Sequence, residues 1–313
     1  MKIALMGSGA LACPLLEGML AAGRDELAAV VTRPDRAGGR GLQCRPCALK
    51  TLARDRGIPT FEPEDASEAG FVERMAALAP DVAVVACYGQ FLRKGLLEVP
   101  KIATINVHPS LLPKYRGASP IQWALANGER ETGVTVLHVT AKMDAGDLLQ
   151  QRAHPIEDAD TMETLEPKLA ALGAELLLEA LEGIREGRTR GIPQDEAQAT
   201  FARKLEKEDG KVDWNLPAAT IRNRWRGFTP WPGAYAALPG GGMLKIHGMR
   251  VEARAAEGGI EPGTVVEAKG DGPLVAAGEG CVRLTAVQPA GKKAMSGSAF
   301  LCGHRLEPGE RFG

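Results

Sequence analysis

The first half of the chain alternates short apolar runs with longer segments of helical periodicity. Residues 81–87 (DVAVVAC) are apolar at every position after the first, which is typical of a strand buried on both faces. We expect strands at Lys2–Met6, Leu27–Thr32, Asp81–Cys87, Ala103–His108 and Gly133–Val139, and helices at Pro14–Ala22, Ala48–Arg56 and Thr161–Glu186. This alternation predicts an α/β domain with a mostly parallel sheet that helices cover on both faces.

The pattern changes around residues 187–210, where Gly187, Gly191 and Pro193 precede a polar stretch that is typical of a linker. Beyond it, short β-like runs are separated by turn sequences rich in Gly and Pro. These runs are Leu244–His247, Gly263–Glu267, Leu274–Ala277 and Val282–Val287. We therefore predict a first domain at 1–187, a linker at 188–207, and a small β-barrel of the OB type at 208–313.

Charge and cysteine content narrow the class of protein. Residues 1–200 carry 22 Lys and Arg against 27 Asp and Glu, whereas residues 201–313 carry 16 against 12. The basic C-terminal part is compatible with a polyanionic partner, although ordinary scatter would also give such a difference. The six cysteines are scattered and no stretch reaches the ~20 apolar residues of a membrane span. We expect a cytoplasmic protein with reduced thiols, and interpret Cys44 and Cys47 as a loop coincidence without a metal.

A glycine-rich turn follows the first predicted strand. Gly7, Gly9 and Ala12 fit the GxGxxA pattern of dinucleotide-binding proteins. That pattern also requires an acidic residue about 20 positions further on, at the end of the second strand. Here the chain has Thr32 and Arg33, and Asp35 lies beyond a proline. An NAD-dependent oxidoreductase is therefore an alternative hypothesis, but a tight turn between strand and helix explains the glycines equally well, and we expect no NAD.

Polar side chains with catalytic potential lie on and after two predicted strands. Asn106 and His108 are two residues apart, so they project from one face of their strand, and Pro109 then ends it. Asp144 follows the next strand, which we expect to place it at the same edge of the sheet. An amide, an imidazole and a carboxylate suit acyl transfer to an amine: the first two stabilise an oxyanion, and the third accepts a proton. An isolated Asn-x-His pair is nevertheless more often structural.

The stretch from Ile105 to Asp147 resembles the core of the 10-formyltetrahydrofolate-dependent formyltransferases. The resemblance implies a Rossmann-like domain without NAD, and a catalytic triad of Asn106, His108 and Asp144. It also implies that an SLLP turn and the end of the 81–87 strand line the cofactor pocket. The cofactor-binding residues that it gives are Ser110, Leu111, Leu112, Pro113, Tyr88 and Gly89.

Three further stretches resemble the methionyl-tRNA formyltransferases within this superfamily. They are a loop rich in glycine and arginine at 32–45, the 201–235 segment with PWPGAY, and the QPAGKKAM sequence at 288–295. The resemblance implies that initiator methionyl-tRNA is the substrate. The tRNA-binding residues that it gives are Arg33, Arg36, Arg40, Arg45, Lys204 and Lys207. We expect a monomer.

The loop departs from its relatives at Leu42, Gln43 and Cys44, where lysines are frequent; that change is expected to weaken tRNA binding. Two alternatives to a tRNA substrate stay open from the sequence. One is a formyltransferase that acts on a small amine, such as an amino sugar nucleotide or glycinamide ribonucleotide. The other is a non-catalytic RNA-binding protein, which would have no use for the triad.

Overall fold

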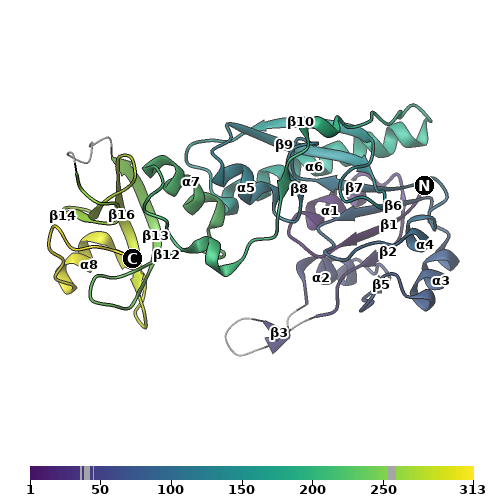
Figure 1. The fold of residues 1–313 in the computed structure, drawn as a ribbon. Coiled ribbons are helices and arrows are strands. Elements are labelled where there is room, and N and C mark those ends of the chain that lie inside the picture. Colours follow the sequence, from purple (N-terminus) through teal and green to yellow (C-terminus); the bar gives the residue numbers. More distant parts are fainter. Residues whose placement is uncertain (36, 39–42, 45, 253–258) are drawn as a thin grey trace. The chain divides into compact units, whose positions relative to one another are not determined.

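The computed structural model describes the chain except residues 36, 39–42, 45 and 253–258 (Figure 1). It divides into two compact units. The first contains Met1–Pro120, Glu131–Ile156 and Thr164–Arg203, and the second contains Ile121–Arg130, Glu157–Glu163 and Lys204–Gly313. Two short segments of the chain, 121–130 and 157–163, therefore belong to the second unit; we call them the two excursions.

A seven-stranded sheet forms the centre of the first unit, in the order β10-β9-β7-β6-β1-β2-β5. Its strands are β1 (Lys2–Gly7), β2 (Glu26–Val31), β5 (Thr60–Phe61), β6 (Val82–Ala86), β7 (Ala103–His108), β9 (Glu131–His138) and β10 (Leu148–Pro155). The five strands from β7 to β5 are parallel to one another, whereas β9 is antiparallel both to β7 and to the edge strand β10. This arrangement confirms the mostly parallel sheet that the sequence predicts.

Helices pack on the sheet through their apolar sides. They are α1 (Ala12–Ala22), α2 (Ala48–Asp55), α3 (Ala69–Leu78), α4 (Lys94–Leu97) and α6 (Met162–Arg185). Phe71 and Met75 of α3 join a buried cluster with Ala4 and Met6 of β1. Helix α6 approaches β7 at Gly173, where an added Cβ would lie 3.2 Å from a methyl of Val107. The helix therefore covers the face of β7 opposite to Asn106 and His108.

Two short ladders complete the first unit. β3 (Ala37–Gly38) pairs with β4 (Gln43–Cys44), and β8 (Arg116–Gly117) pairs in parallel with β11 (Phe201–Ala202). The backbone of Ile192 also exchanges two hydrogen bonds with Leu148, and the short 3-10 helix η1 (Glu196–Gln198) follows. Residues 192–202 are thus bound along their length to the first unit.

The second unit is built on an antiparallel sheet in the order β12-β13-β16-β15-β14, with β17 beside β16. Its strands are β12 (Ala234–Ala237), β13 (Met243–Glu252), β14 (Val265–Lys269), β15 (Gly272–Ala276), β16 (Cys281–Pro289) and β17 (Met295–Ser296). η2 (Lys207–Gly210), α7 (Ala218–Phe228) and α8 (Gly297–Gly303) accompany it, and Trp214, Leu284 and Phe300 lie in its core. The four β-like runs predicted beyond residue 240 all overlap strands of this sheet.

Helix α7 explains why the two short excursions belong to the second unit. Trp123 of α5 (Pro120–Ala126) packs edge-on against Phe228, with ring centroids 5.5 Å apart. The buried Arg226 guanidinium donates to the backbone carbonyls of Glu157, Asp158 and Asp160. Both excursions are therefore held on α7 by packing and by charge-assisted hydrogen bonds.

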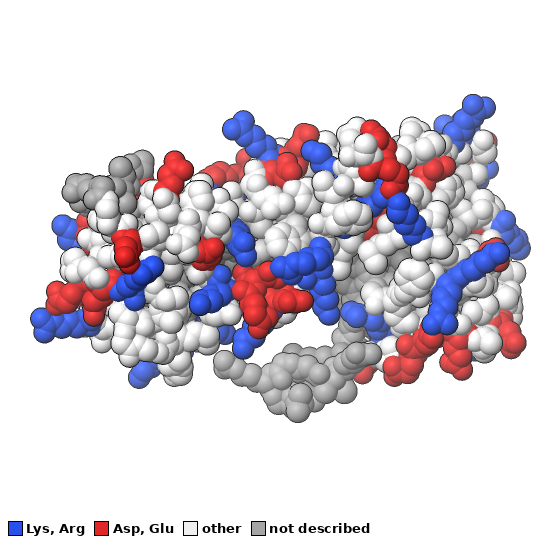
Figure 2. All heavy atoms as spheres, in the orientation of Figure 1, with Lys and Arg blue, Asp and Glu red and all other residues white. Residues whose placement is uncertain are grey.

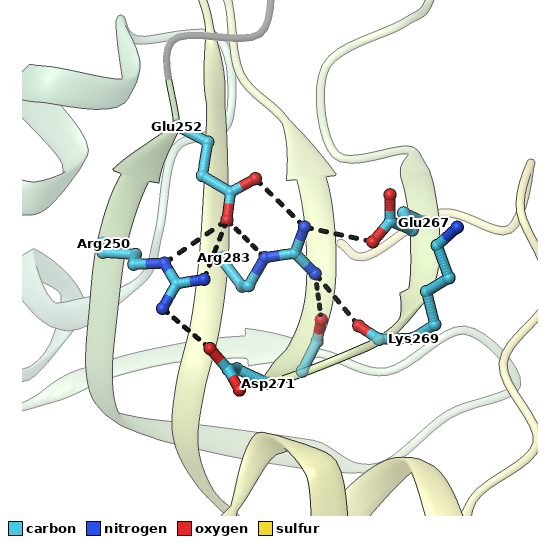
Figure 3. A network of polar contacts seen from close by, with 7 residues as sticks. Arg250, Glu252, Glu267, Lys269, Asp271 and Arg283 are labelled. Atoms are coloured by element: carbon cyan, nitrogen blue, oxygen red, sulfur yellow. Dashed lines mark hydrogen bonds and ion pairs between the residues drawn. The ribbon is translucent and has the colours of Figure 1, made fainter.

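A buried arginine joins three strands of the second unit (Figure 3). The Arg283 guanidinium on β16 contacts Glu252 of β13 at 2.5 and 3.0 Å and Glu267 of β14 at 3.2 Å. Its Nη1 donates to the carbonyls of Lys269 and Gly272 at 3.0 and 2.9 Å. Every nitrogen of this buried charge therefore has a partner, which is the condition for burying an ion without a large penalty.

Within the described parts of the chain, no helix is both long enough and apolar enough to cross a membrane. Acidic and basic side chains are interspersed on the face that Figure 2 draws. The net positive charge of the C-terminal part therefore does not collect into one continuous patch on that face.

Candidate active site

Strand β7 presents Asn106 and His108 at the end of the parallel part of the sheet. His108 is 4% exposed and Asn106 is half-buried. The Nε2 atom of His108 lies 3.0 Å from the carbonyl oxygen of Tyr115, so this nitrogen carries a proton and donates it to the carbonyl. The imidazole is thereby fixed with Nδ1 directed away from Tyr115.

Asp144 lies on the segment that joins β9 to β10, and its backbone has a positive φ of 49°. Its carboxylate Oδ2 accepts a hydrogen bond of 2.8 Å from the backbone N–H of Gly117. The side-chain amide of Gln194 donates to the carbonyls of Asp144 and Gly146, at 2.8 and 2.7 Å. A side chain of Gly146 is excluded, because a Cβ there would lie 1.8 Å from the carbonyl of His138. The Asp144 loop is therefore tightly positioned.

These three side chains converge. Asn106 Nδ2 donates to Asp144 Oδ1 at 3.3 Å, and His108 Nδ1 lies 3.7 Å from Asp144 Oδ2. The Asp144 side chain is 13% exposed, so the group is largely shielded from water but still reachable. An amide donor, an imidazole that can donate from Nδ1 when it is charged, and a carboxylate can together stabilise a developing oxyanion and accept a proton beside it.

The structure brings Asp144 to this position by a route other than the one expected. Strand β9 runs antiparallel to β7, and its last residue, His138, pairs with Ile105 rather than reaching the carboxyl edge of the sheet. The segment after β9 instead returns across β7 to contact Asn106 and His108. Asp144 is therefore found beside Asn106 and His108 as expected, although the strand before it, β9, is antiparallel to β7.

The SLLP turn is anchored against β9 and β10. Ser110 is fully buried and its hydroxyl donates to the Lys114 carbonyl at 2.7 Å, while its own carbonyl accepts from Thr135. The backbone of Leu112, also buried, bonds to Thr135 and to Gln151. Leu111 and Pro113 are the half-buried members of the turn. Of the four residues, these two offer side-chain surface to a ligand.

The end of β6 supplies the other residues expected to bind a cofactor. Tyr88 is buried, and its burial raises the pKa of the phenol to about 12, while the Arg33 guanidinium opposes that shift. Gly89 is exposed with a φ of 74°, and a Cβ there would lie 3.1 Å from the Arg33 guanidinium. Arg33, expected from the sequence to bind tRNA, therefore lies beside Gly89.

The remaining residues expected to bind tRNA fall in different places. Lys204 and Lys207 are exposed side chains at the beginning of the second unit. Arg36, Arg40 and Arg45 lie outside the residues that the structure describes.

Sequence reasoning missed Arg116 and Gln194. Gln194 binds the backbone of the Asp144 loop, and Arg116 in turn binds Gln194. The Arg116 side chain is fully buried and donates to Gln194 Oε1 at 3.1 and 2.8 Å. Arg116 also pairs with Glu196 at 2.9 Å, and Lys142 contacts the same carboxylate. Arg116, with the smaller help of Lys142, lowers the pKa of Glu196 to about 2. The only signal for Arg116 was its place three residues after the SLLP turn, and nothing marked Gln194.

The glycine-rich turn after β1 is explained by packing. A Cβ on Gly7 would lie 2.7 Å from that of Ala12 and 2.8 Å from the Ala86 carbonyl, and one on Gly9 would lie 2.9 Å from the Cβ of Cys87. Glycine is therefore required wherever α1 begins this close to β6. Among the residues with described positions, no cluster of three or more His, Cys, Asp or Glu side chains could hold a metal ion.

Comparison with known proteins gives matches over both units. Residues 1–181 match the family model "Formyl transferase", and residues 204–305 match "Formyl transferase, C-terminal domain". The methionyl-tRNA formyltransferase of Anaeromyxobacter dehalogenans strain 2CP-1 is 48% identical over 297 residues, which is 95% of each chain. That of Geotalea uraniireducens is 42% identical over 313 residues, covering all of this chain and 98% of the relative.

Solved structures share the fold at lower identity. The sugar 3N-formyltransferase WlaRD superposes with a TM-score of 0.67 at 18% identity, over 94% of this chain and 99% of that one. HypX from Aquifex aeolicus, in complex with tetrahydrofolic acid, gives a TM-score of 0.64 at 19% identity, over 96% of this chain and 47% of that one. These likenesses support the two-part architecture.

Proposed function

The chain belongs to the methionyl-tRNA formyltransferase family, and on this premise we propose that it formylates methionyl initiator tRNA for translation initiation. The formyl group comes from 10-formyltetrahydrofolate and is transferred to the free amino group of the esterified methionine. The observation that carries the proposal is the convergence of the Asn106 amide and the His108 Nδ1 on the Asp144 carboxylate.

The transfer replaces one carbon–nitrogen bond by another. The amine of the aminoacyl group attacks the formyl carbon, and negative charge develops on the formyl oxygen. The Asn106 amide donates to that oxygen. Because His108 Nε2 is already bound to the Tyr115 carbonyl, His108 can donate only from Nδ1, which it does in its imidazolium form. When the intermediate collapses, the bond from the formyl carbon to N10 of tetrahydrofolate breaks and N10 takes up a proton.

Asp144 manages the proton that the attacking nitrogen must lose. Its Oδ2 is held by the Gly117 N–H and lies 3.7 Å from His108 Nδ1. A carboxylate in this position accepts the proton directly or through one water molecule. Gln194 positions the loop through two carbonyls and does not itself touch the reacting atoms.

The residues around this group fit a flat, partly apolar co-substrate. Leu111 and Pro113, in the turn after β7, offer half-buried apolar surface. Gly89 is exposed and follows the end of β6, the strand next to β7. We assign these three residues to folate binding. Ser110, Leu112 and Tyr88 support the pocket from within the core, because their side chains are buried.

We assign catalysis to the first unit. We assign tRNA binding to the second unit and to the 33–45 loop. Lys204, Lys207, Arg33, Arg36, Arg40 and Arg45 are the cations proposed to contact tRNA phosphates. Neutralising several phosphates makes affinity fall steeply with salt. We further propose that the protein acts as a monomer in the cytoplasm.

The proposal is tested with purified protein, 10-formyltetrahydrofolate and initiator tRNA. Formyl transfer is expected to methionine-charged tRNA and not to uncharged tRNA, with tetrahydrofolate released in equal amount. An amino sugar nucleotide and glycinamide ribonucleotide serve as competing acceptors in the same assay. Transfer to either of these, without transfer to charged tRNA, would overturn the assignment of the substrate.

A further inference from the structure

Phe201 is unusually exposed for an aromatic residue in a strand. Its exposed fraction is 74%, the largest among the exposed large apolar side chains of the described residues. Its neighbour Ala202 is fully buried. A single exposed apolar residue is ordinary on a protein surface, so the significance of Phe201 depends on where it lies and how it is held.

The exposure does not come from a loose chain end. Strand β11 is fixed on both sides of Phe201, because Arg116 donates to the Thr200 carbonyl at 2.9 Å and Ala118 donates to the Ala202 carbonyl at 2.9 Å. The Thr200 N–H also donates to the Pro113 carbonyl at 3.2 Å. The ring is therefore presented from a rigid backbone, which lowers the entropy that binding would cost.

The same segment supports both ends of the catalytic group. Thr200, next to Phe201, accepts a hydrogen bond from the Tyr115 N–H at 2.8 Å, and the Tyr115 carbonyl holds His108. Arg116 pairs with Phe201, and the following residue, Gly117, binds Asp144. Because paired strands lie about 5 Å apart, the backbone of Phe201 is one strand away from the residues that hold the site.

Two other exposed apolar side chains come from segments that contact the Asp144 loop. Met143, 59% exposed, directly precedes Asp144. Ile192, 63% exposed, is two residues before Gln194, whose amide binds the Asp144 carbonyl. Exposed apolar side chains thus occur both in the Asp144 loop and in the segment that holds it.

We propose that Phe201 is the stacking platform for the terminal nucleoside of the aminoacyl-tRNA. This inference rests on the proposed function. The amino group that receives the formyl group is joined through an ester to the terminal ribose. Only the methionyl ester and that ribose separate the terminal base from the reacting nitrogen, so the base must lie near the catalytic group. A flat aromatic ring on a rigid strand next to that group is the surface that an unpaired base requires.

Stacking contributes to substrate binding, and we therefore expect it to appear mainly in KM for charged tRNA. Phe201→Ala is expected to raise that KM about tenfold or more, with the KM for 10-formyltetrahydrofolate unchanged. Phe201→Trp is expected to retain the affinity, because it keeps an aromatic face. Phe201→Leu keeps an apolar side chain without that face, and is expected to behave like the alanine variant.

A double-substitution cycle separates stacking from general damage. The second change is made in the substrate, as methionyl-tRNA whose terminal nucleotide lacks its base. If Phe201 stacks on that base, the base-free substrate and Phe201→Ala each weaken binding, and combining them adds little further loss. Ile102→Ala, at an exposed apolar residue just before β7, is the matched control and should leave every parameter unchanged.

Several outcomes would overturn the proposal. Wild-type KM in Phe201→Ala would do so, as would equal losses on the intact and the base-free substrates, or full affinity in Phe201→Leu. A change of oligomeric state in Phe201→Ala without a change in KM would assign the ring to contact between protein chains instead. Failure of the wild-type protein to formylate charged tRNA is a separate result and refutes the proposed function itself.

Discussion

Gln194 offers a sharp test of how the catalytic carboxylate is positioned. Its side chain donates to the carbonyls of Asp144 and Gly146 and accepts two hydrogen bonds from the buried Arg116. The two donated bonds contribute about 2 kcal/mol together, at about 1 kcal/mol each. The two bonds from Arg116 have a charged donor and are individually stronger. Because Arg116 keeps its ion pair with Glu196 in the variant, we count their loss as only about 2 kcal/mol more.

Gln194→Ala is therefore expected to lower the free energy of unfolding by roughly 4 kcal/mol, a large part of the stability of an ordinary domain. It also frees the Asp144 loop. A displacement of the carboxylate by 1 Å is expected to reduce kcat by about a hundredfold, with the KM for the folate co-substrate unchanged. Gln194 is a positioning residue, so the loss should appear in kcat and not in cofactor affinity.

The measurements are urea unfolding and single-turnover formylation at a temperature where the variant stays folded. Gln198→Ala is the matched control, because the side chain of this exposed glutamine donates to the nearby Asp195 carboxylate, and its loss should change stability by no more than about 0.5 kcal/mol. Equal stability and equal kcat in the two variants would refute the reasoning. A fully folded Gln194→Ala with normal kcat would show that the loop holds Asp144 without this amide.

Two further predictions concern charged groups. Arg116 and Lys142 lower the pKa of Glu196 to about 2. The Glu196 carboxylate therefore contributes fully to stability above its ordinary pKa of 4.5, and this contribution is lost as pH falls towards 2. Glu196→Gln should therefore be less stable than wild type at pH 7, with a difference in urea midpoint that shrinks between pH 4.5 and 2; a constant difference would contradict this. Glu252→Ala should destabilise the second unit by about 3–5 kcal/mol by leaving the buried Arg283 without its main partner, whereas Glu261→Ala, at an exposed pair, should change stability by less than about 1 kcal/mol. Thermal unfolding of the two variants measures this, and equal melting temperatures would refute the role given to the buried arginine.

Sequence periodicity was sufficient to predict those elements that bury one apolar face and expose the other. The alternation at residues 103–108 placed Asn106 and His108 on one face of a strand, and the structure brings both to Asp144. The long apolar spacing of 161–186 likewise gave α6, which spans Met162–Arg185. These elements are specified locally, because burial selects their apolar positions.

Periodicity failed where the decisive interaction was long-range. Three of the eight residues of β10 are exposed and its apolar stretches are short, so nothing local marked it as the strand that completes the sheet. Gly191 was one of the residues from which the linker was predicted, but a Cβ there would lie 2.7 Å from that of Asp147, so this glycine is required by packing. Gln194, 50 residues from Asp144, carries no local signal of the bond between them.

The central claim is that Asn106, His108 and Asp144 act on one formyl carbon, and the most direct measurement is the rate of single-turnover formylation together with folate affinity. Asn106→Ala and His108→Ala are expected to lose most of the turnover, because each removes a donor to the developing oxyanion, which typically costs about 10²–10³ in kcat. Both variants should bind the folate co-substrate as wild type does. Wild-type rates in both variants would contradict the account, however close together the structure places these side chains.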